Sequence, residues 1–283
     1  MSIQSGQSDR GTVGRLVVCP TPIGNLGDVT LRVLDALRDA DAIACEDTRR
    51  TRVLLERYEI AGSLLSYHEH NERERARELV GRIQRGAVIA LVSDAGTPLV
   101  SDPGWALLQE CLAANVQVEV LPGPSSVLTA LMASGLPAER WRFTGFLPRK
   151  RAELERALGE SQETLVAFES PGRLVATLEV LASLDAMRPV AVCRELTKLH
   201  EEIRRGAAAE LCSHYRQSPP RGEIVLVVGA SVSGGADRDE ALAALRALVD
   251  AGARARPAAG VVAKLTGMSA NELYRGVVVS KGT

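Results

Sequence analysis

The amino-acid sequence predicts an α/β protein with two α/β domains and a small helical module at its C-terminus. Short apolar segments alternate with amphipathic segments of helix length from residue 16 onward, which is typical of strands and helices in succession. The connections between the apolar segments have the length of helical crossovers, which parallel strands require. The apolar segments are nearly continuous, as expected for strands that helices cover on both faces.

The first domain is expected to contain five parallel strands, each followed by a helix. The strands are predicted at residues 16–19, 42–45, 63–68, 88–92 and 116–121. The helices are predicted at residues 30–40, 49–58, 72–84, 104–114 and 125–135, where apolar residues recur with the helical period.

The second half has the same alternation in looser form. Strands are predicted at 163–168, 189–196 and 223–228, and helices at 172–184 and 208–216. A segment rich in Gly, Ser and Asp follows, and then two segments with helical periodicity, the second of which fits a helix-turn-helix or a simple packing hairpin. The expected limits are a disordered tail (1–13), an N-terminal α/β domain (14–124), a C-terminal α/β domain (125–230), a linker (231–239) and a helical module (240–283).

Composition excludes several classes of protein. The chain has 283 residues, 46% of them hydrophobic and 24% charged, which is a globular composition. No apolar run reaches the roughly 18 residues of a membrane span, and the polar N-terminus has no signal-peptide pattern. The five cysteines are widely spaced and lie mostly in apolar runs, as expected of free thiols in the cytoplasm. Because the net charge is −1, a nucleic-acid partner would need a local basic patch.

The loops after the predicted strands carry most of the Gly, Pro and polar residues. Ligands of open parallel sheets bind beyond the carboxyl ends of the strands, where these loops lie. The first loop, PTPIGNLGD, does not match the GxGxxG fingerprint of dinucleotide-binding proteins. The fourth loop, SDAGTPLVSDPG, presents Asp94, Thr97, Ser101 and Asp102 between two Gly/Pro turns. It predicts either a ligand-binding loop or a tight turn into the next helix.

The chain resembles the ribosomal RNA small subunit methyltransferase I family of the tetrapyrrole-methylase-like superfamily. The resemblance covers residues 15–283. It rests on the ordered motifs TPIGNLGDVTLR, CEDTRRTR, SYHEHNE, ALVSDAGTPLVSDPG, LPGPSS, TGFLP, FESPGRL, CRELTKLHEEI and GEIVLVVG. It implies two α/β domains with a cleft between them, S-adenosylmethionine as methyl donor, a homodimer, and methylation of a cytidine ribose in the decoding region of 16S ribosomal RNA in the small subunit.

The resemblance also implies which residues bind the methyl donor. Gly/Pro turns, an apolar wall and nearby carboxylates suit a cofactor with an adenosine, a sulfonium and an amino-acid part. The residues expected to line this pocket are Asp94, Ala95, Gly96, Thr97, Leu121, Pro122, Gly123, Ser125 and Ser126 of the first domain, with Phe168 and Glu169 of the second.

The acceptor side is expected at the ends of the second and third strands. Methyl transfer needs a positioned hydroxyl oxygen and a group that accepts its proton. The candidates are Glu46, Asp47, Arg49, His68, Asn71 and Glu72. His68 and His70 lie two apart on a predicted strand, hence on one face, but no third ligand is evident and we expect no metal. These polar residues could instead be surface and helix-capping groups.

Segments 169–173 and 194–198 are further candidates for the site, with no individual chemistry assigned. Two alternative functions remain open from the sequence. One is a methyltransferase of the same superfamily that acts on a small molecule or a protein histidine derivative. The other is an RNA-binding ribosome-assembly factor without turnover. The helical module argues against the first, and the intact SDAGTP loop argues against the second.

Overall fold

A computed structural model describes residues 14–159, 161–231, 238–266 and 268–278. The expected N-terminal tail, most of the linker and the expected turn residue Gly267 lie outside the described residues. The chain divides into two compact units. The first extends up to residue 133 and includes residues 193–203 and 223–225, whereas the second contains 134–192, 204–222 and the residues from 226 onward. The domain limits expected from the sequence stay a prediction.

The first unit is a five-stranded parallel sheet with the strand order β3-β2-β4-β1-β5. The strands are β1 (Arg15–Cys19), β2 (Ala42–Cys45), β3 (Leu64–Ser66), β4 (Val88–Val92) and β5 (Gln117–Val120). The helices are α1 (Leu31–Asp39), α2 (Thr48–Arg57), α3 (Glu72–Gln84), α4 (Trp105–Ala113) and α5 (Ser126–Ser134), with a short 3₁₀ helix η1 (Leu26–Asp28) after β1.

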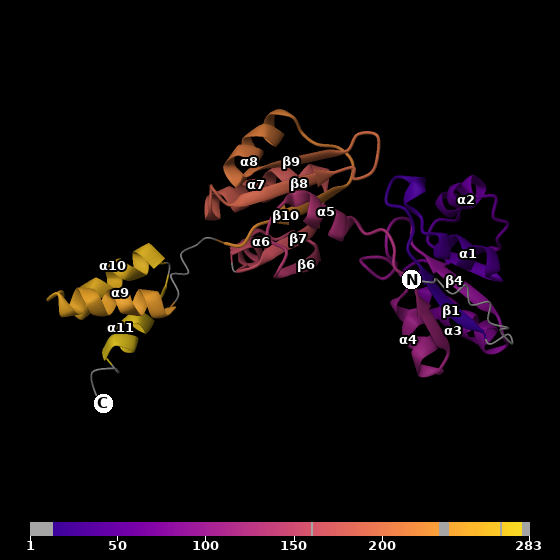
Figure 1. Cartoon of the computed structure of the whole chain (residues 1–283), viewed down its shortest axis with the longest axis horizontal. Helices are drawn as coiled ribbons and strands as arrows, with labels where there is room; N and C mark the ends of the chain where they lie inside the picture. Colours follow the sequence, from indigo (N-terminus) through magenta and orange to yellow (C-terminus); the bar gives the residue numbers. More distant parts are fainter. Residues whose placement is uncertain (1–13, 160, 232–237, 267, 279–283) are drawn as a thin grey trace, which may run out of the picture. The chain divides into compact units, whose positions relative to one another are not determined.

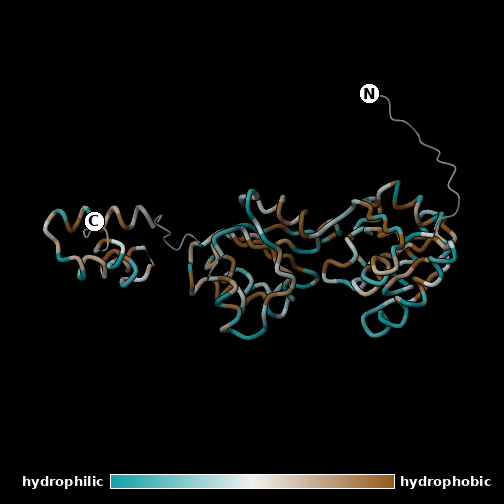
Figure 2. The backbone as a smooth tube through the Cα atoms, turned by 90° about the horizontal axis from the view of Figure 1, so that it is seen from below, coloured by the Kyte–Doolittle hydropathy of each residue, from teal (hydrophilic) through white to brown (hydrophobic). Residues whose placement is uncertain are grey.

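Helices cover both faces of this sheet, because successive strand residues point to opposite sides. Leu16 and Val18 of β1 pack with residues of α3 and α4, whereas Val17 and Cys19 pack with residues of α1 and α2. Figure 2 shows the hydrophobic segments gathered inside each α/β unit. The prediction of doubly covered strands therefore holds for β1, β2 and β4, which are buried almost throughout.

Strand β5 differs from the prediction of a fully covered strand. It is an edge strand, and Gln117 and Val120 are exposed. Alternating polar residues in the segment VQVEVL fit this position, because only one side of an edge strand pairs with a neighbour. The strand still brings its following loop to the same sheet edge as the loop after β1, since the two strands are parallel and in register.

The second unit contains another five-stranded sheet, with the order β6-β7-β10-β8-β9. Its strands are β6 (Trp141–Phe146), β7 (Thr164–Glu169), β8 (Pro189–Arg194), β9 (Glu202–Ala207) and β10 (Ile224–Val228), and its helices are α6 (Arg151–Gly159), α7 (Pro171–Leu184) and α8 (Ala208–Gln217). Strand β9 was not predicted, because its sequence EIRRGA lacks an apolar run.

Arg188 is a fully buried cation in the second unit. Its guanidinium donates hydrogen bonds to the backbone carbonyls of Gly229 and Ser161, at 2.8 Å and 3.4 Å, and to that of Leu158. Burial lowers the pKa of Arg188. The side chain thereby ties three segments together, and without it the buried carbonyls of Gly229 and Leu158 would lack a donor.

The C-terminal helices form a core of their own. Helices α9 (Arg238–Asp250), α10 (Ala255–Thr266) and α11 (Ala270–Val278) pack through Leu245, Ala259 and Leu273, each about 1% exposed or less. Figure 1 shows the three helices packed against one another. The two α/β domains and the C-terminal helical module expected from the sequence are therefore present.

Two further features follow from the described residues. None of their helices combines the length and the apolar character needed to cross a bilayer. All five cysteines are buried free thiols.

Candidate functional site

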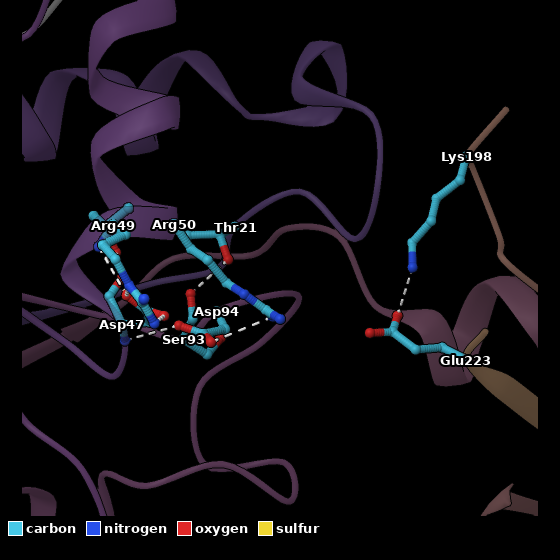
Figure 3. Close-up of polar contacts among 9 residues, drawn as sticks. Thr21, Asp47, Arg49, Arg50, Ser93, Asp94, Lys198 and Glu223 are labelled. Atoms are coloured by element: carbon cyan, nitrogen blue, oxygen red, sulfur yellow. Dashed lines mark hydrogen bonds and ion pairs between the residues drawn. The ribbon is translucent and has the colours of Figure 1, made fainter. Parts of the chain in front are cut away.

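The loops after β1 and β4 are joined by paired backbone hydrogen bonds. The Thr21 amide donates to the Gly96 carbonyl at 2.8 Å, and the Gly96 amide donates to the Thr21 carbonyl at 2.9 Å. The Thr21 hydroxyl also donates to the Ser93 carbonyl at 3.0 Å (Figure 3), and the Ser93 hydroxyl donates to the Gly96 carbonyl at 3.1 Å. These contacts hold the SDAGTP loop in one conformation beyond the sheet edge.

A glycine is needed at position 96 because of the backbone geometry, and not because Gly96 donates a hydrogen bond to a ligand. Its φ is +83°, in the region that favours glycine, and an added Cβ would lie 3.3 Å from Ile23 Cγ2. Its own amide and carbonyl are both used by Thr21. No hydrogen-bond acceptor is found among the described residues for the amides of the half-buried Ala95 and Thr97, so both amides can donate to a ligand.

The loop after β5 joins the same edge. The Thr97 hydroxyl donates to the Pro124 carbonyl at 3.1 Å, and the buried Leu121 donates its amide to Val18. Gly123 is exposed, but an added Cβ would lie 2.6 Å from Pro20 Cβ. The Ser125 hydroxyl accepts from the Leu128 amide at 3.4 Å at the start of α5, which begins at Ser126. The exposed Pro122 lies in the same loop.

Asp94 connects the β4 loop to the loop after β2. One carboxylate oxygen accepts a hydrogen bond from the Asp47 amide at 3.0 Å, and the other lies 3.4 Å from an Arg50 guanidinium nitrogen (Figure 3). Of the three, Arg50 was not among the residues singled out from the sequence. Its only sequence signal is its place in the first turn of α2, which directly follows Asp47.

Asp47 is the N-cap of α2. Its carboxylate accepts from the Arg49 amide at 2.9 Å and from two Arg49 guanidinium nitrogens at 3.0 Å and 2.7 Å. The hydrogen bonds from Arg49 lower the pKa of Asp47 to about 2. Asp47 is consequently a weak proton acceptor, and the capping role that the sequence left open is present for this residue.

Glu46 and Asp102 add two carboxyl groups to the surroundings of Asp94. Burial, followed by repulsion from Asp94, raises the pKa of Glu46, which Arg50 and His68 partly oppose. Burial, with repulsion from Glu46 and Asp94, raises the pKa of Asp102 to about 7. Sequence reasoning named Asp102 as part of its loop but gave it no role, because Glu46, which adds to the repulsion, comes from a distant part of the chain.

His68 and Asn71 lie in a turn, so the expectation that His68 and His70 share a face of a strand is wrong. Strand β3 ends at Ser66, and the Asn71 side chain accepts a hydrogen bond from the His68 amide at 2.9 Å. The Asn71 amide nitrogen lies 3.3 Å from His68 Nε2. His68 Nδ1 is buried and has no hydrogen-bond partner.

Glu72 is directed to the start of α4. Its carboxylate lies 3.4 Å from the Gly104 amide and accepts a hydrogen bond from it. The hydroxyl of the buried Tyr67 accepts a hydrogen bond from the Leu107 amide, also in α4, at 3.2 Å. These contacts satisfy amides at a helix N-terminus, which otherwise lack partners. The contact favours a structural role for Glu72.

Phe168 and Glu169 lie at the end of β7 in the second unit. The buried Glu169 carboxylate accepts hydrogen bonds from the Thr177 hydroxyl at 2.6 Å and from the Ser170 amide at 2.8 Å. It also lies 3.5 Å from the guanidinium of Arg173. All its described contacts are therefore with neighbouring segments of the same unit. The half-buried Phe168 ring packs edge-on against Phe143.

The segment 193–203 belongs to the first unit and contacts the loop after β1. A Cβ on Gly24 would lie 2.5 Å from Lys198 Cγ. The Lys198 ammonium donates to Glu223 at 2.9 Å (Figure 3). It also donates to Glu195 at 2.8 Å, and this hydrogen bond lowers the pKa of Glu195. Glu195 and Thr197 both have positive φ. Lys198 thus fastens this strained segment.

The loops after β1, β2, β4 and β5 meet beyond one edge of the sheet. Glu46, Asp94 and Asp102 supply carboxylates, and free amides lie beside them. Such a set suits a ligand that carries positive charge together with hydrogen-bond acceptors. Within the described residues, no group of three or more His, Cys, Asp or Glu side chains is arranged to hold a metal ion.

Comparison with known proteins places this chain in a family. A family model described as Tetrapyrrole (Corrin/Porphyrin) Methylases matches residues 15–212. A protein named ribosomal RNA small subunit methyltransferase I from Micromonospora olivasterospora is 45% identical, over 96% of this chain and 88% of its own length. The protein of the same name from Escherichia coli O157:H7 is 40% identical, over 98% of this chain and 99% of its own length.

Solved structures support the fold. A uroporphyrin-III C-methyl transferase from Thermus thermophilus, complexed with S-adenyl homocysteine, superposes with a TM-score of 0.55 at 21% identity, covering 76% of this chain and 97% of that chain. A cobalt precorrin-4 methyltransferase superposes with a TM-score of 0.58 at 19% identity, covering 79% and 98%. The chain therefore belongs to the tetrapyrrole methylase family, and within it to the ribosomal RNA small subunit methyltransferase I proteins.

Proposed function

We propose that the chain transfers a methyl group from S-adenosylmethionine to a ribose 2′-hydroxyl of a cytidine in the decoding region of 16S ribosomal RNA. The observation that carries the proposal is the 40–45% identity to small-subunit methyltransferases over almost the whole chain. The site residues are part of this shared length. We place the activity in the cytoplasm and the active form as a homodimer.

The residues at the sheet edge fit the methyl donor. S-adenosylmethionine supplies a methyl group activated by a positively charged sulfonium. The carboxylates of Asp94, Glu46 and Asp102 favour a cation, and the Ala95 and Thr97 amides offer donors to its polar groups. The Leu121 loop would contribute apolar surface. Phe168 and Glu169 remain proposed members of this pocket.

The acceptor residues divide into two groups by their contacts. Asp47, Asn71 and Glu72 are engaged in holding α2, the His68 turn and α4, so we assign them positioning roles. Glu46, with a raised pKa, and His68, with an unpartnered ring nitrogen, are available to take the hydroxyl proton. A proton acceptor works best when its pKa lies near the working pH.

The C-terminal helices are proposed to recruit RNA. Arg254, Arg256, Lys264 and Arg275 are exposed cations of α10, α11 and the turn before them, and Lys281 lies outside the described residues. The Arg256 guanidinium lies 5.8 Å from the centre of the Tyr274 ring. A cluster of this kind can meet phosphates although the whole chain is near neutral.

The test is methyl transfer to small subunits that lack ribose methylation. The full chain is incubated with S-adenosylmethionine carrying a labelled methyl group, and the product nucleotide is located by mass spectrometry. We expect one methylated ribose in 16S ribosomal RNA. Label on a small molecule but not on RNA would instead favour another branch of the family, and subunit binding without transfer would indicate an assembly factor.

Two matched variants test the roles of the carboxylates. Glu46→Gln should reduce turnover by about tenfold or more with little change in cofactor affinity, because it removes a proton acceptor. Glu72→Gln keeps a side-chain acceptor for the Gly104 amide and should leave turnover near that of the wild type. Equal rates for Glu46→Gln and the wild type would assign the proton acceptor to another group, with His68→Gln as the next variant.

A further inference from the structure

The three phenylalanines of the chain form one cluster in the second unit. Phe143 and Phe168 have ring centroids 5.0 Å apart, and Phe146 and Phe168 have theirs 5.4 Å apart, both edge-on. Phe143 and Phe168 are half-buried, but Phe146 is 63% exposed. Phe146 is the last residue of β6, an edge strand. The exposed Phe146 ring thus packs on Phe168, which in turn packs on Phe143, and it presents an apolar surface.

The backbone around Phe146 is fixed by buried polar contacts. Gly145 has a φ of +65°, and the pairing of β6 with β7 shifts register between Phe143 and Phe146. Such a bulge lets two residues three apart contact the same ring. The Arg173 guanidinium then donates to the Leu147 carbonyl and, at 2.6 Å, to the Pro148 carbonyl. The position of the exposed ring is therefore set before any ligand binds.

The sequence segment that contains Phe146 has an excess of positive charge. Residues 140–156 contain six Arg or Lys and two Glu, in a chain whose net charge is −1. Lys150 pairs with Glu153 at 3.1 Å, and Arg151 pairs with Glu155 at 2.8 Å. Arg149 is exposed and has no carboxylate within ion-pair distance among the described residues. Its guanidinium is free to meet an external anion.

We propose that Phe146 and Arg149 form a contact site for single-stranded RNA, in which an unpaired base stacks on the Phe146 ring and Arg149 meets a backbone phosphate. The inference rests on the proposed function in taking RNA as the partner, and it deepens that function by naming the contact. Aromatic rings beside cations are the arrangement by which proteins hold single strands, because every base has a stackable face and every nucleotide a negative charge. An apolar partner alone would have no use for the local excess of cations.

The test is binding of a short fluorescent single-stranded oligoribonucleotide, and of the same strand annealed to its complement, to the full chain. Phe146→Ala should weaken binding of the single strand by about tenfold, whereas Phe146→Trp should retain it and the duplex should bind both variants alike. Arg149→Ala should lower the slope of log affinity against log salt by about one. The matched controls are Met187→Ala, which removes another exposed apolar side chain of this unit, and Arg216→Gln on α8.

Three results would overturn the inference. The first is wild-type affinity of Phe146→Ala for the single strand. The second is loss of S-adenosylmethionine binding in Phe146→Ala, which would make the ring a wall of the donor pocket. The third is a change from dimer to monomer in light scattering, which would make it a contact between copies. The titration measures binding and needs no methyl transfer. If the wild-type chain binds the oligonucleotide through Phe146 but does not methylate subunits, the proposed function is refuted and the contact site is retained.

Discussion

Replacing Asp102 by Asn is expected to change how the stability of the protein depends on pH. Asp102 is half-buried in the loop after β4, and burial together with Glu46 and Asp94 raises its pKa to about 7 from the usual 3.8. The folded protein therefore holds this proton more tightly than the unfolded chain does. Between these two pKa values the folded state binds more protons, so rising pH destabilises it.

The size of the effect follows from the shift. A difference of roughly three pKa units at about 1.4 kcal/mol each sets an upper limit of about 4 kcal/mol. Solvent reaches part of the side chain and screens the repulsion, so about half of this limit, roughly 2 kcal/mol, is the expected cost of ionised Asp102. This cost is absent below about pH 4, develops as the pH rises, and is complete above about pH 7.

The assay is urea unfolding of the wild type and of Asp102→Asn at several values between about pH 5 and pH 8. The free energy of unfolding of the variant should exceed that of the wild type by roughly 1 kcal/mol more at the upper end than at the lower end, because about a third of the cost has already developed at pH 5. Asp39→Asn, an exposed carboxylate at the end of α1, controls for the loss of one surface charge. A difference between Asp102→Asn and the wild type that stays constant over this range would refute the reasoning.

Three other predictions concern the donor loop, the second core and the helical module. Gly96→Val should abolish S-adenosylmethionine binding in calorimetry while the circular dichroism spectrum stays that of the wild type. A β-branched residue is strained at φ +83° and would disturb the paired backbone hydrogen bonds between residues 96 and 21. Near-normal affinity would remove Gly96 from the pocket. Arg188→Met should lower the free energy of unfolding by about 3 kcal/mol, since the buried carbonyls of Gly229 and Leu158 lose their donor, and a wild-type urea midpoint would contradict this role. Removal of residues 236–283 should weaken small-subunit binding and reduce its salt dependence without changing cofactor affinity. Loss of the dimer or of solubility on truncation would instead show that these helices pack against the rest of the protein.

Local patterns were sufficient to predict most of the elements. The alternation of apolar and amphipathic segments predicted β1, β2, β4 and their helices, because a strand covered on both faces is apolar throughout and a covering helix has one apolar stripe. The pattern misjudged β5, whose edge position depends on its neighbours, and predicted no strand for β6 or β9, whose residues are mostly polar, half-buried or exposed. Strand order and edge position are properties of the whole sheet.

The candidate residues were harder to assign individually. The loops after parallel strands were expected to meet at one edge, and the bonds of Thr21, Asp94 and Thr97 join them there. The assignment of donor-pocket and catalytic residues stays a prediction. The carboxylates of Asp47 and Glu72 accept hydrogen bonds from backbone amides of the chain. Such contacts depend on the orientation of side chains and could not be predicted from residue type.

The sequence by itself determined the family, the succession of strands and helices, and the loops that carry polar residues, because each depends on short motifs or on local periodicity. Only the tertiary structure decided that Asp102 lies near Glu46, that Arg50 approaches Asp94, and that the exposed Phe146 packs on the Phe168 ring. These relations join residues from separate segments. Their energies depend on distance and burial, which appear only when the sheet brings the segments together.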